Sequence, residues 1–444
     1  MKILHISTRL ILGGSQENTI LSCEGQARAG HEVHLAFGPI YGPEGSMLER
    51  AQSFTTECGR KITTHEVPDM VRQVSPLRDP RCYRQLRALI EAIRPDIVHT
   101  HSSKAGIIGR LAAWNVREAA SRSSKPRPAV VHTIHGPPFM PVEGSLLQRA
   151  KQRMANSIYT LAERTAARRC HAIISVADAM TEQFLARGIG HRALYTTVRS
   201  GIELAPYLDE ATIGASAAAR AKLCEHLAQL GTPRPFIIGT VARLAQHKGH
   251  DDLLSAVALL MATDPALASR ICLLWVGDGW WRDRLVSRAR AIGMRVITND
   301  SSPSQPPIPP HTELTKGPIL LLTGMVPPDE VPRQIRLMDV LCHPSYREGL
   351  PRTVPQALLC RVLPIAYDVD GTREACIDGQ TGRLLAPGDV AALAQALQWA
   401  AANPDAARIM AENGHQRCIK LWSTQAMLTG LDAVYAEAIA RASR

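Results

Sequence analysis

The chain has few aromatic residues and no long hydrophobic run. Phe, Trp and Tyr make up 4% of its 444 residues, too few for the stacking surfaces that bind single-stranded nucleic acid. No stretch of about 18 apolar residues occurs, so the sequence predicts no membrane-spanning helix. The apolar part of residues 1–8 is interrupted by His5 and is too short for a signal peptide. We therefore expect a cytoplasmic protein with no nucleic-acid partner.

The cysteines also lack a pattern. The ten cysteines are scattered and form no Cys-x-x-Cys pair, which argues against a zinc site and against a disulfide framework. We expect reduced thiols, most of them packed as small core residues.

Positive charge exceeds negative charge, with a formal net charge of +11. The basic residues are spread along the chain except in residues 148–169, where six of them meet a single acid, Glu163, and apolar residues lie between them. Two interpretations stay open. The segment is either a solvated helix packed by its apolar face, or a helix that lies on an anionic membrane surface.

Apolar strands alternate with amphipathic helices along the first half of the chain. The predicted strands are residues 2–7, 32–37, 96–100, 130–134 and 172–176. The helices predicted between them are residues 15–28, 82–93, 104–113 and 178–186. This alternation predicts right-handed βαβ units and a doubly wound parallel sheet, in the α/β class.

The pattern restarts in the second half. Its predicted strands are residues 236–241, 271–276, 319–323, 340–343 and 362–367. We expect one domain over residues 1–204 and a second over 205–415, with a C-terminal helix at about 416–444 that packs back on the first. The Pro- and Ser-rich residues 298–317 are predicted to form a surface insertion. Ligands of such sheets bind outside the carboxyl ends of the strands, which predicts a cleft between the two domains.

Two loops of the second half carry candidate binding residues. Arg243 and Lys248 follow the strand at 236–241, and two cations in such a loop suit a diphosphate, although surface cations are common. Glu348 follows the strand at 340–343 and is suited to accept hydrogen bonds from sugar hydroxyls. Gly349 permits a tight turn, and a helix is expected from Pro351 or Arg352. A purely structural loop is the alternative.

Histidines mark the strand ends of the first half. His132 and His135 cannot share a metal ion from one strand, because their side chains point to opposite faces. We expect His132 to be packed and His135, just before Gly136, to face the cleft.

Taken together, these motifs resemble glycosyltransferase family 4, which has the GT-B fold of two Rossmann-like domains facing each other across a cleft. The matching segments are Gly13-Gly14, 96–101, His135-Gly136, 239–249, Gly324, 348–356, 370–374 and Thr381-Gly382.

The resemblance implies a retaining transferase that moves a hexose-type sugar from a nucleotide diphosphate donor to a glycan or lipid-linked acceptor. It implies a role in cell-surface polysaccharide or glycolipid synthesis, with no cofactor and no metal. The basic residues 148–169 lead us to expect that this cytoplasmic enzyme works at the inner face of the cytoplasmic membrane.

The resemblance also implies roles for single residues. Arg243 and Lys248 would hold the diphosphate, and Gly14 would approach the phosphate or the acceptor. The catalytic residues would be His135 and Glu348, both near the donor sugar. The amides at Gly349 and Leu350 would lie near sugar and phosphate.

One position departs from the family pattern. Gln356 stands where the family has a glutamate that binds ribose hydroxyls. A glutamine keeps one acceptor but loses the charge, so we expect a weaker donor complex. A non-catalytic sugar-nucleotide binder and a sugar-nucleotide epimerase remain as alternatives.

Overall fold

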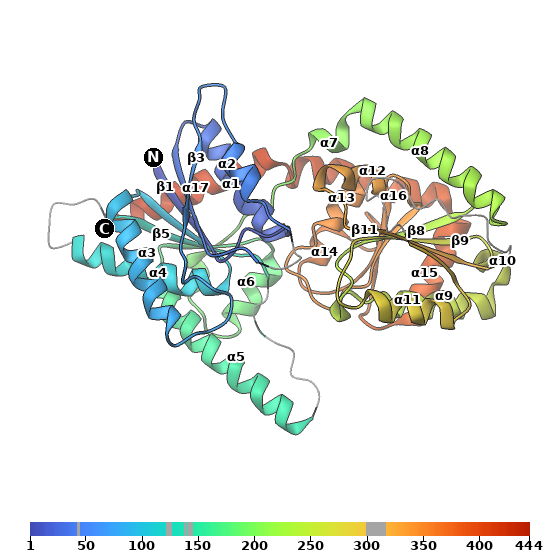
Figure 1. Cartoon of the computed structure of the whole chain (residues 1–444), viewed down its shortest axis with the longest axis horizontal. Helices are drawn as coiled ribbons and strands as arrows, with labels where there is room; N and C mark the ends of the chain where they lie inside the picture. The colour runs from blue at the N-terminus through green and yellow to red at the C-terminus, as the bar shows by residue number, and fades with distance from the viewer. Residues whose placement is uncertain (42–44, 121–126, 137–138, 140–144, 299–316) are drawn as a thin grey trace. The chain divides into compact units, whose positions relative to one another are not determined.

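The computed structural model describes residues 1–41, 45–120, 127–136, 139, 145–298 and 317–444 (Figure 1). The chain forms two compact units. Unit 1 contains Met1–Ile202 and Thr424–Arg444, and unit 2 contains Glu203–Ser423. Most of the predicted insertion, residues 299–316, lies outside the described residues.

Unit 1 is built on a seven-stranded parallel sheet in the order β3-β2-β1-β4-β5-β6-β7. Its strands are β1 (Lys2–Ser7), β2 (Glu32–Phe37), β3 (Ile62–Glu66), β4 (Ile97–His101), β5 (Ala129–Ile134), β6 (Ala172–Ser175) and β7 (Tyr195–Thr197). Its helices are α1 (Gly14–Arg28), α2 (Leu48–Ser53), α3 (Arg78–Ile93), α4 (Ser103–Ala120), α5 (Leu146–Ala167), α6 (Asp178–Leu185) and α17 (Thr424–Ala442).

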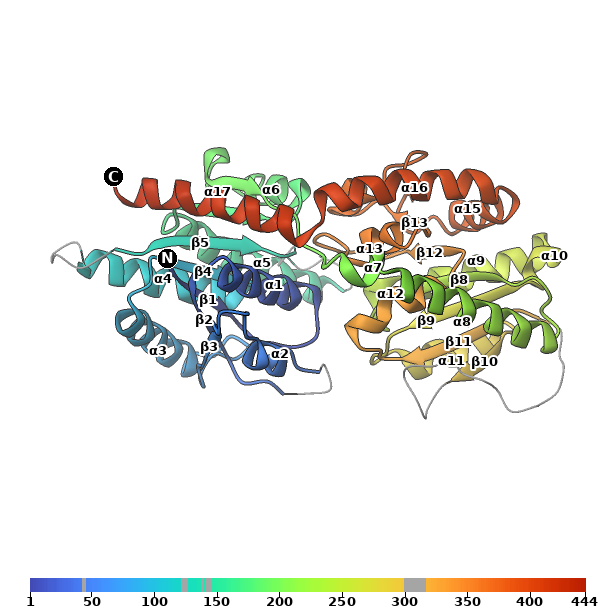
Figure 2. The same cartoon turned by 90° about the horizontal axis from the view of Figure 1, so that it is seen from above.

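The last helix of the chain completes the core of unit 1. Helix α17 lies along β5 (Figure 2). Its buried residues, among them Met427, Leu431 and Tyr435, pack on Ile97 and Val131 of the central strands. Part of one face of the first sheet is therefore covered by residues from the far end of the sequence, beside α1.

Unit 2 repeats the architecture with the strand order β10-β11-β9-β8-β12-β13-β14, again parallel throughout. The strands are β8 (Phe236–Val241), β9 (Ile271–Val276), β10 (Arg295–Thr298), β11 (Ile319–Gly324), β12 (Val340–His343), β13 (Leu363–Tyr367) and β14 (Arg383–Leu385). The helices are α7 (Ala205–Leu208), α8 (Glu210–Gln229), α9 (His250–Thr263), α10 (Pro265–Ala268), α11 (Arg282–Ala291), α12 (Val331–Ile335), α13 (Thr353–Leu359), α14 (Thr372–Ala375), α15 (Val390–Ala402) and α16 (Pro404–Leu421). The central strands β8, β9 and β12 are almost wholly buried, as expected where helices cover both faces of a parallel sheet.

The prediction of one C-terminal helix from about residue 416 was wrong. Helix α16 ends at Leu421 and α17 begins at Thr424, with Trp422 buried between them. The backbone N–H of Thr424 donates to Ile202 O, 3.1 Å away, so the chain re-enters unit 1 beside the point where it left. Residues 416–421 therefore belong to unit 2, and only α17 returns.

Candidate functional site

The two predicted loops of unit 2 lie at the point where its strand order reverses. Strand β8 is flanked by β9 on one side and by β12 on the other. The connections that follow β8 and β12 diverge there, and ligands of open α/β sheets bind at the carboxyl ends of the strands at such a point. Arg243 and Lys248 follow β8, and Glu348 follows β12.

Lys248 and Glu348 meet directly at this point. The Lys248 Nζ lies 2.5 Å from Glu348 Oε1, and both side chains are largely buried. His343, the last residue of β12, donates from Nε2 to the same oxygen at 3.0 Å, while its Nδ1 accepts from the Thr353 hydroxyl at 3.2 Å. Among the described residues, none donates to the second oxygen, Oε2, of Glu348.

The carboxyl group of Glu348 is held in its charged form. Burial alone would raise its pKa, but the Lys248 ammonium and the hydrogen bond from His343 hold the pKa of Glu348 well below its usual value. The site therefore presents an anion beside a cation at neutral pH.

Gly249 brings the two loops together. Its φ of 69° lies in the left-handed region, and a Cβ atom there would come within 1.8 Å of Pro344 O. The adjacent backbone is joined by the Tyr346 N–H, which donates to His247 O at 2.8 Å. Only glycine permits this contact, a role that the sequence pattern did not reveal.

The turn at Gly277–Gly279 supports the same loop. The Leu244 N–H donates to Asp278 O at 3.1 Å, and a Cβ atom on Gly279 would lie 2.4 Å from Leu244 O. These glycines therefore serve the close packing of the Arg243 loop.

The other predicted residues of unit 2 lie around the pair. Arg243 is exposed on the loop, and Gly349 accepts through its carbonyl from the Gly371 N–H at 3.0 Å. Leu350 is buried. Gln356 is half-buried on α13, which begins at Thr353, just after the predicted start.

Unit 1 places its own predicted residues at the carboxyl ends of β1 and β5. Gly14 is exposed as the first residue of α1. His132 is buried and its Nδ1 lies 2.9 Å from the Thr100 hydroxyl, whereas His135 is half-buried, which agrees with the predicted contrast between the two. The Nε2 of His135 lies 3.0 Å from Nδ1 of His101, a contact that sequence reasoning missed.

Models of glycosyltransferase families match both halves of the chain. The family model described as Glycosyltransferase Family 4 matches residues 12–205, and the model described as Glycosyl transferases group 1 matches residues 235–403. The chain belongs to glycosyltransferase family 4. It is an enzyme of the sugar-transferring type.

Several glycosyltransferases are similar to the chain. The UDP-Gal:alpha-D-GlcNAc-diphosphoundecaprenol alpha-1,3-galactosyltransferase of Escherichia coli is 24% identical, over 84% of this chain and 80% of its own length. The capsular polysaccharide biosynthesis glycosyltransferase CapM of Staphylococcus aureus is 21% identical, over 84% of each chain. The 2-deoxystreptamine N-acetyl-D-glucosaminyltransferase of Streptomyces fradiae is 28% identical, over 68% of this chain but 62% of its own length.

Solved structures show that this glycosyltransferase has the GT-B fold. Anabaena Alr3699/HepE in complex with UDP matches with a TM-score of 0.69 at 17% identity, covering 98% of this chain and 100% of that one. The sucrose-phosphate synthase of Thermosynechococcus elongatus matches with a TM-score of 0.71 at 18% identity, covering 99% of each chain.

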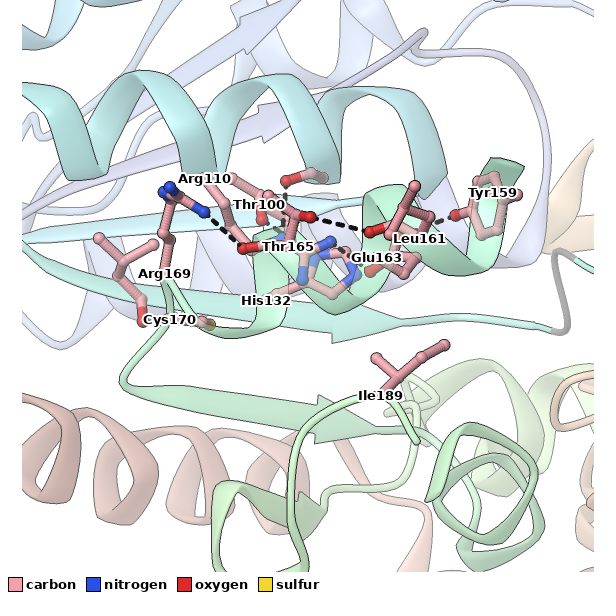
Figure 3. A network of polar contacts seen from close by, with 12 residues as sticks. Thr100, Arg110, His132, Tyr159, Leu161, Glu163, Thr165, Arg169, Cys170 and Ile189 are labelled. Atoms are coloured by element: carbon pink, nitrogen blue, oxygen red, sulfur yellow. Dashed lines mark hydrogen bonds and ion pairs between the residues drawn. The ribbon is translucent and has the colours of Figure 1, made fainter. Parts of the chain in front are cut away.

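Helix α5 of this glycosyltransferase carries the basic segment found in the sequence. Its one acid, Glu163, is buried rather than part of a solvated face: Arg110 of α4 donates to Glu163 Oε2 at 2.6 Å and the Tyr159 hydroxyl donates to Oε1 at 2.9 Å (Figure 3). This ion pair fixes the C-terminal part of α5 against α4.

The N-terminal part of α5 is exposed and extends beyond the rest of unit 1 (Figure 1). Five large apolar side chains on the helix are 61–85% exposed: Leu146, Leu147, Met154, Ile158 and Leu161. Helical spacing places Leu147, Met154, Ile158 and Leu161 on the side opposite Glu163. Of the basic residues, Lys151 borders this apolar side, whereas Arg149 and Arg153 lie on the flank nearer Glu163. No helix in the described part of the chain is long and apolar enough to cross a membrane.

Proposed function

We propose that the enzyme transfers a hexose-type sugar from a nucleotide diphosphate donor to a glycan or lipid-linked acceptor, with retention of anomeric configuration. The observation that carries the proposal is the Lys248–Glu348 pair at the strand-order reversal of unit 2. A diphosphate sugar needs a cation for its phosphates beside an acceptor for its hydroxyls, and the pair supplies both.

The pair can bind a donor without being broken. An ammonium carries three N–H groups, so Lys248 can donate to Glu348 and to a phosphate oxygen at once. The Oε2 atom of Glu348 can accept from a sugar hydroxyl, and Arg243 on the same loop can contact the diphosphate. Gln356 would bind the ribose and the amides at Gly349 and Leu350 the sugar and phosphate.

Charge develops on the leaving diphosphate as the sugar–phosphate bond breaks. Lys248 and Arg243 would stabilise that charge electrostatically, which replaces a metal ion in the proposed mechanism. The diphosphate would take the proton of the acceptor hydroxyl, which attacks from the side of the departing group. We propose that His135 contacts the donor sugar and Gly14 the phosphate or the acceptor.

The names of similar proteins support the donor and acceptor classes. The Escherichia coli relative is named for a UDP-linked galactose and a diphosphoundecaprenol acceptor, and the Staphylococcus aureus relative for capsular polysaccharide biosynthesis. Structures of Anabaena Alr3699/HepE are described with UDP and with UDP-glucose.

A lipid-linked acceptor would place the enzyme at an anionic membrane surface, on the cytoplasmic side. The exposed apolar stripe of α5 with its basic residues supports this placement, because apolar side chains enter the headgroup region while lysine and arginine meet anionic lipid.

A donor screen tests the function. Thermal-shift measurements with UDP-, GDP-, ADP- and TDP-linked hexoses should show one nucleotide sugar that stabilises the enzyme. The enzyme should slowly hydrolyse this donor and release its nucleoside diphosphate, also in the presence of EDTA. NMR of the transferred product should show the anomeric configuration of the donor. An inverted product would contradict retention, activity restored only by a divalent ion would contradict the metal-free route, and no response to any donor would contradict the function.

A further inference from the structure

A chain of hydrogen bonds runs from the interior of unit 1 to His135. The Gln26 Oε1 lies 2.7 Å from His5 Nε2, His5 Nδ1 lies 2.8 Å from His101 Nε2, and His101 Nδ1 lies 3.0 Å from His135 Nε2. We call this series the histidine relay. Gln26, His5 and His101 are all buried, and the His101 ring stacks on those of His5 and His135.

The topology of the sheet explains the relay. Strand β1 pairs with β4 so that His5 lies beside His99, and His101 lies two residues further along β4 on the same face. His135 directly follows β5, the next strand of the sheet. Gln26 reaches His5 from α1.

The buried histidines of the relay are neutral. Burial lowers the pKa of His5 to about 4, despite the hydrogen bond to Gln26, and burial with neighbouring histidines holds the pKa of His101 well below its usual value. A neutral imidazole has one N–H and one bare nitrogen. Each link between two rings therefore needs a donor on one side and a bare nitrogen on the other.

Gln26 sets the direction of the donors. Its Nε2 donates to the Tyr435 hydroxyl at 3.1 Å, which turns Oε1 toward His5. The Tyr435 hydroxyl lies 2.6 Å from Nδ1 of His99, and Nε2 of His99 lies 2.7 Å from the Thr133 hydroxyl. Because an amide oxygen only accepts, His5 must carry its hydrogen on Nε2, His101 on Nε2, and His135 on Nε2.

We propose that Gln26, His5 and His101 are positioning residues that hold His135 as the tautomer with hydrogen on Nε2, so that its Nδ1 accepts a hydrogen bond from a hydroxyl of the bound sugar. The sugar contact rests on the proposed function, whereas the tautomer does not.

The relay orients His135 and does not conduct protons. A proton passed inward from His135 would reach His5 Nε2 and stop, because the amide of Gln26 does not ionise. Nor does the relay hold a metal ion, although the ring nitrogens of His5, His99 and His101 lie within 4.8 Å of one another. Two nitrogens on one tetrahedral zinc ion lie roughly 3.3 Å apart, further than the 2.8 Å between His5 and His101.

Nitrogen NMR of the histidine rings tests the tautomer in the whole protein without any donor. In ¹⁵N-histidine-labelled enzyme at pH 7.5, the signals lost in His135→Gln identify His135. We expect them to show hydrogen on Nε2 and a bare Nδ1. Hydrogen on Nδ1 of His135, or signals averaged over its two tautomers, would overturn the proposal. The proposal would also fail if the purified protein contained zinc and its removal by a chelator changed these signals.

A pair of variants links the tautomer to the reaction. Gln26→Met keeps the side-chain size but removes the acceptor, so His135 should populate both tautomers and kcat should fall roughly three- to tenfold, the effect of one neutral hydrogen bond. Thr100→Val removes a buried hydroxyl from the opposite face of β4, outside the relay. It should leave the tautomer of His135 and kcat unchanged. Equal losses of kcat in both variants would contradict the proposal, as would a single tautomer of His135 in Gln26→Met. If Gln26→Met does not fold, the tautomer of His135 in the wild-type spectrum decides whether the proposal holds.

Discussion

The Glu348 carboxylate is the most constrained charge of the candidate site, because Lys248 and His343 both donate to one of its oxygens. Glu348→Gln keeps the shape and removes the charge. We expect transfer to fall about 10- to 150-fold, the range for loss of a charge-assisted hydrogen bond. The depressed pKa of Glu348 further predicts that this group causes no loss of activity between pH 7 and pH 5. Steady-state kinetics over this range check both expectations.

The matched control for Glu348 is Glu412→Gln. Glu412 pairs with Arg361 at 2.6 Å, but both side chains are exposed, and exposed pairs contribute little. We expect unchanged kinetics in the control, and equal activity in the two variants would remove Glu348 from the reaction.

Gln356 tests whether α13 contacts the ribose of the donor. Gln356→Ala should weaken donor binding about two- to tenfold through loss of a neutral hydrogen bond, while Gln356→Glu should keep or improve it by adding a charged acceptor. Isothermal titration gives the Kd values, with Gln416→Ala, at an exposed position of α16, as the control. A Kd unaffected by Gln356→Ala would exclude the ribose contact.

The exposed apolar and basic residues of helix α5 predict that it binds an anionic lipid surface. Charge reversal of Arg149, Lys151 and Arg153 to glutamate should reduce binding to vesicles of anionic lipid. Binding by the wild type should also fall with salt, because screened charges attract less. Vesicle co-sedimentation measures both effects, with neutral vesicles for comparison.

Two further variants separate charge from apolar contact at α5. Reversal at the exposed residues Arg60, Lys61 and Arg81 changes the net charge of unit 1 equally and should leave binding intact. Serine at Leu147, Met154 and Ile158 should weaken binding while its salt dependence remains. Weak binding of the wild type to both kinds of vesicle would instead support a solvated helix.

The elements that the sequence predicted best are those with continuous apolar runs. The predicted strands 236–241, 271–276 and 340–343 coincide with β8, β9 and β12, because strands buried on both faces need apolar residues throughout. Short outer strands such as β7 and β10 are only half-buried and carry polar residues, so no periodicity marks them. The break between α16 and α17 has neither glycine nor proline, and it escaped prediction for that reason.

The candidate site was predictable only one loop at a time. The positions of Lys248 and Glu348 at strand ends follow from local patterns, but their contact depends on β8 and β12 being neighbours. The histidine relay depends on more long-range contacts than the Lys248–Glu348 pair does. It forms only because β1, β4 and β5 are neighbours in the sheet and because α17 returns to place Tyr435 beside Gln26. Such long-range pairing cannot be read from spacing in one sequence.

At the scale of the whole molecule, buried histidines make unit 1 the acid-sensitive half. Five buried histidines of unit 1 have lowered pKa values: His5, His99, His101, His132 and His171. In unit 2 the same holds for His250 and His415. A histidine that stays neutral when folded but takes a proton when unfolded destabilises the fold as pH falls from about 6.5 toward its folded pKa, by about 1.4 kcal/mol per pH unit.

Hydrogen exchange at several pH values checks this difference between the units. After correction for intrinsic rates, amides of β1, β4 and β5 should lose protection between pH 7 and pH 4.5 before those of β8, β9 and β12. Earlier loss in unit 2 would show that other groups govern the acid response.

The return of α17 to unit 1 determines the order in which the halves can mature on the ribosome. Every residue of unit 2 is synthesised before Thr424, whereas the first sheet waits for α17 to cover part of one of its faces and to supply Tyr435 to Gln26. At ordinary elongation rates of roughly 5–20 residues per second, the first 202 residues wait more than ten seconds for their last helix. The part of the enzyme made first is thus the part completed last, and during that interval the area of the sheet that α17 will cover is open to chaperones.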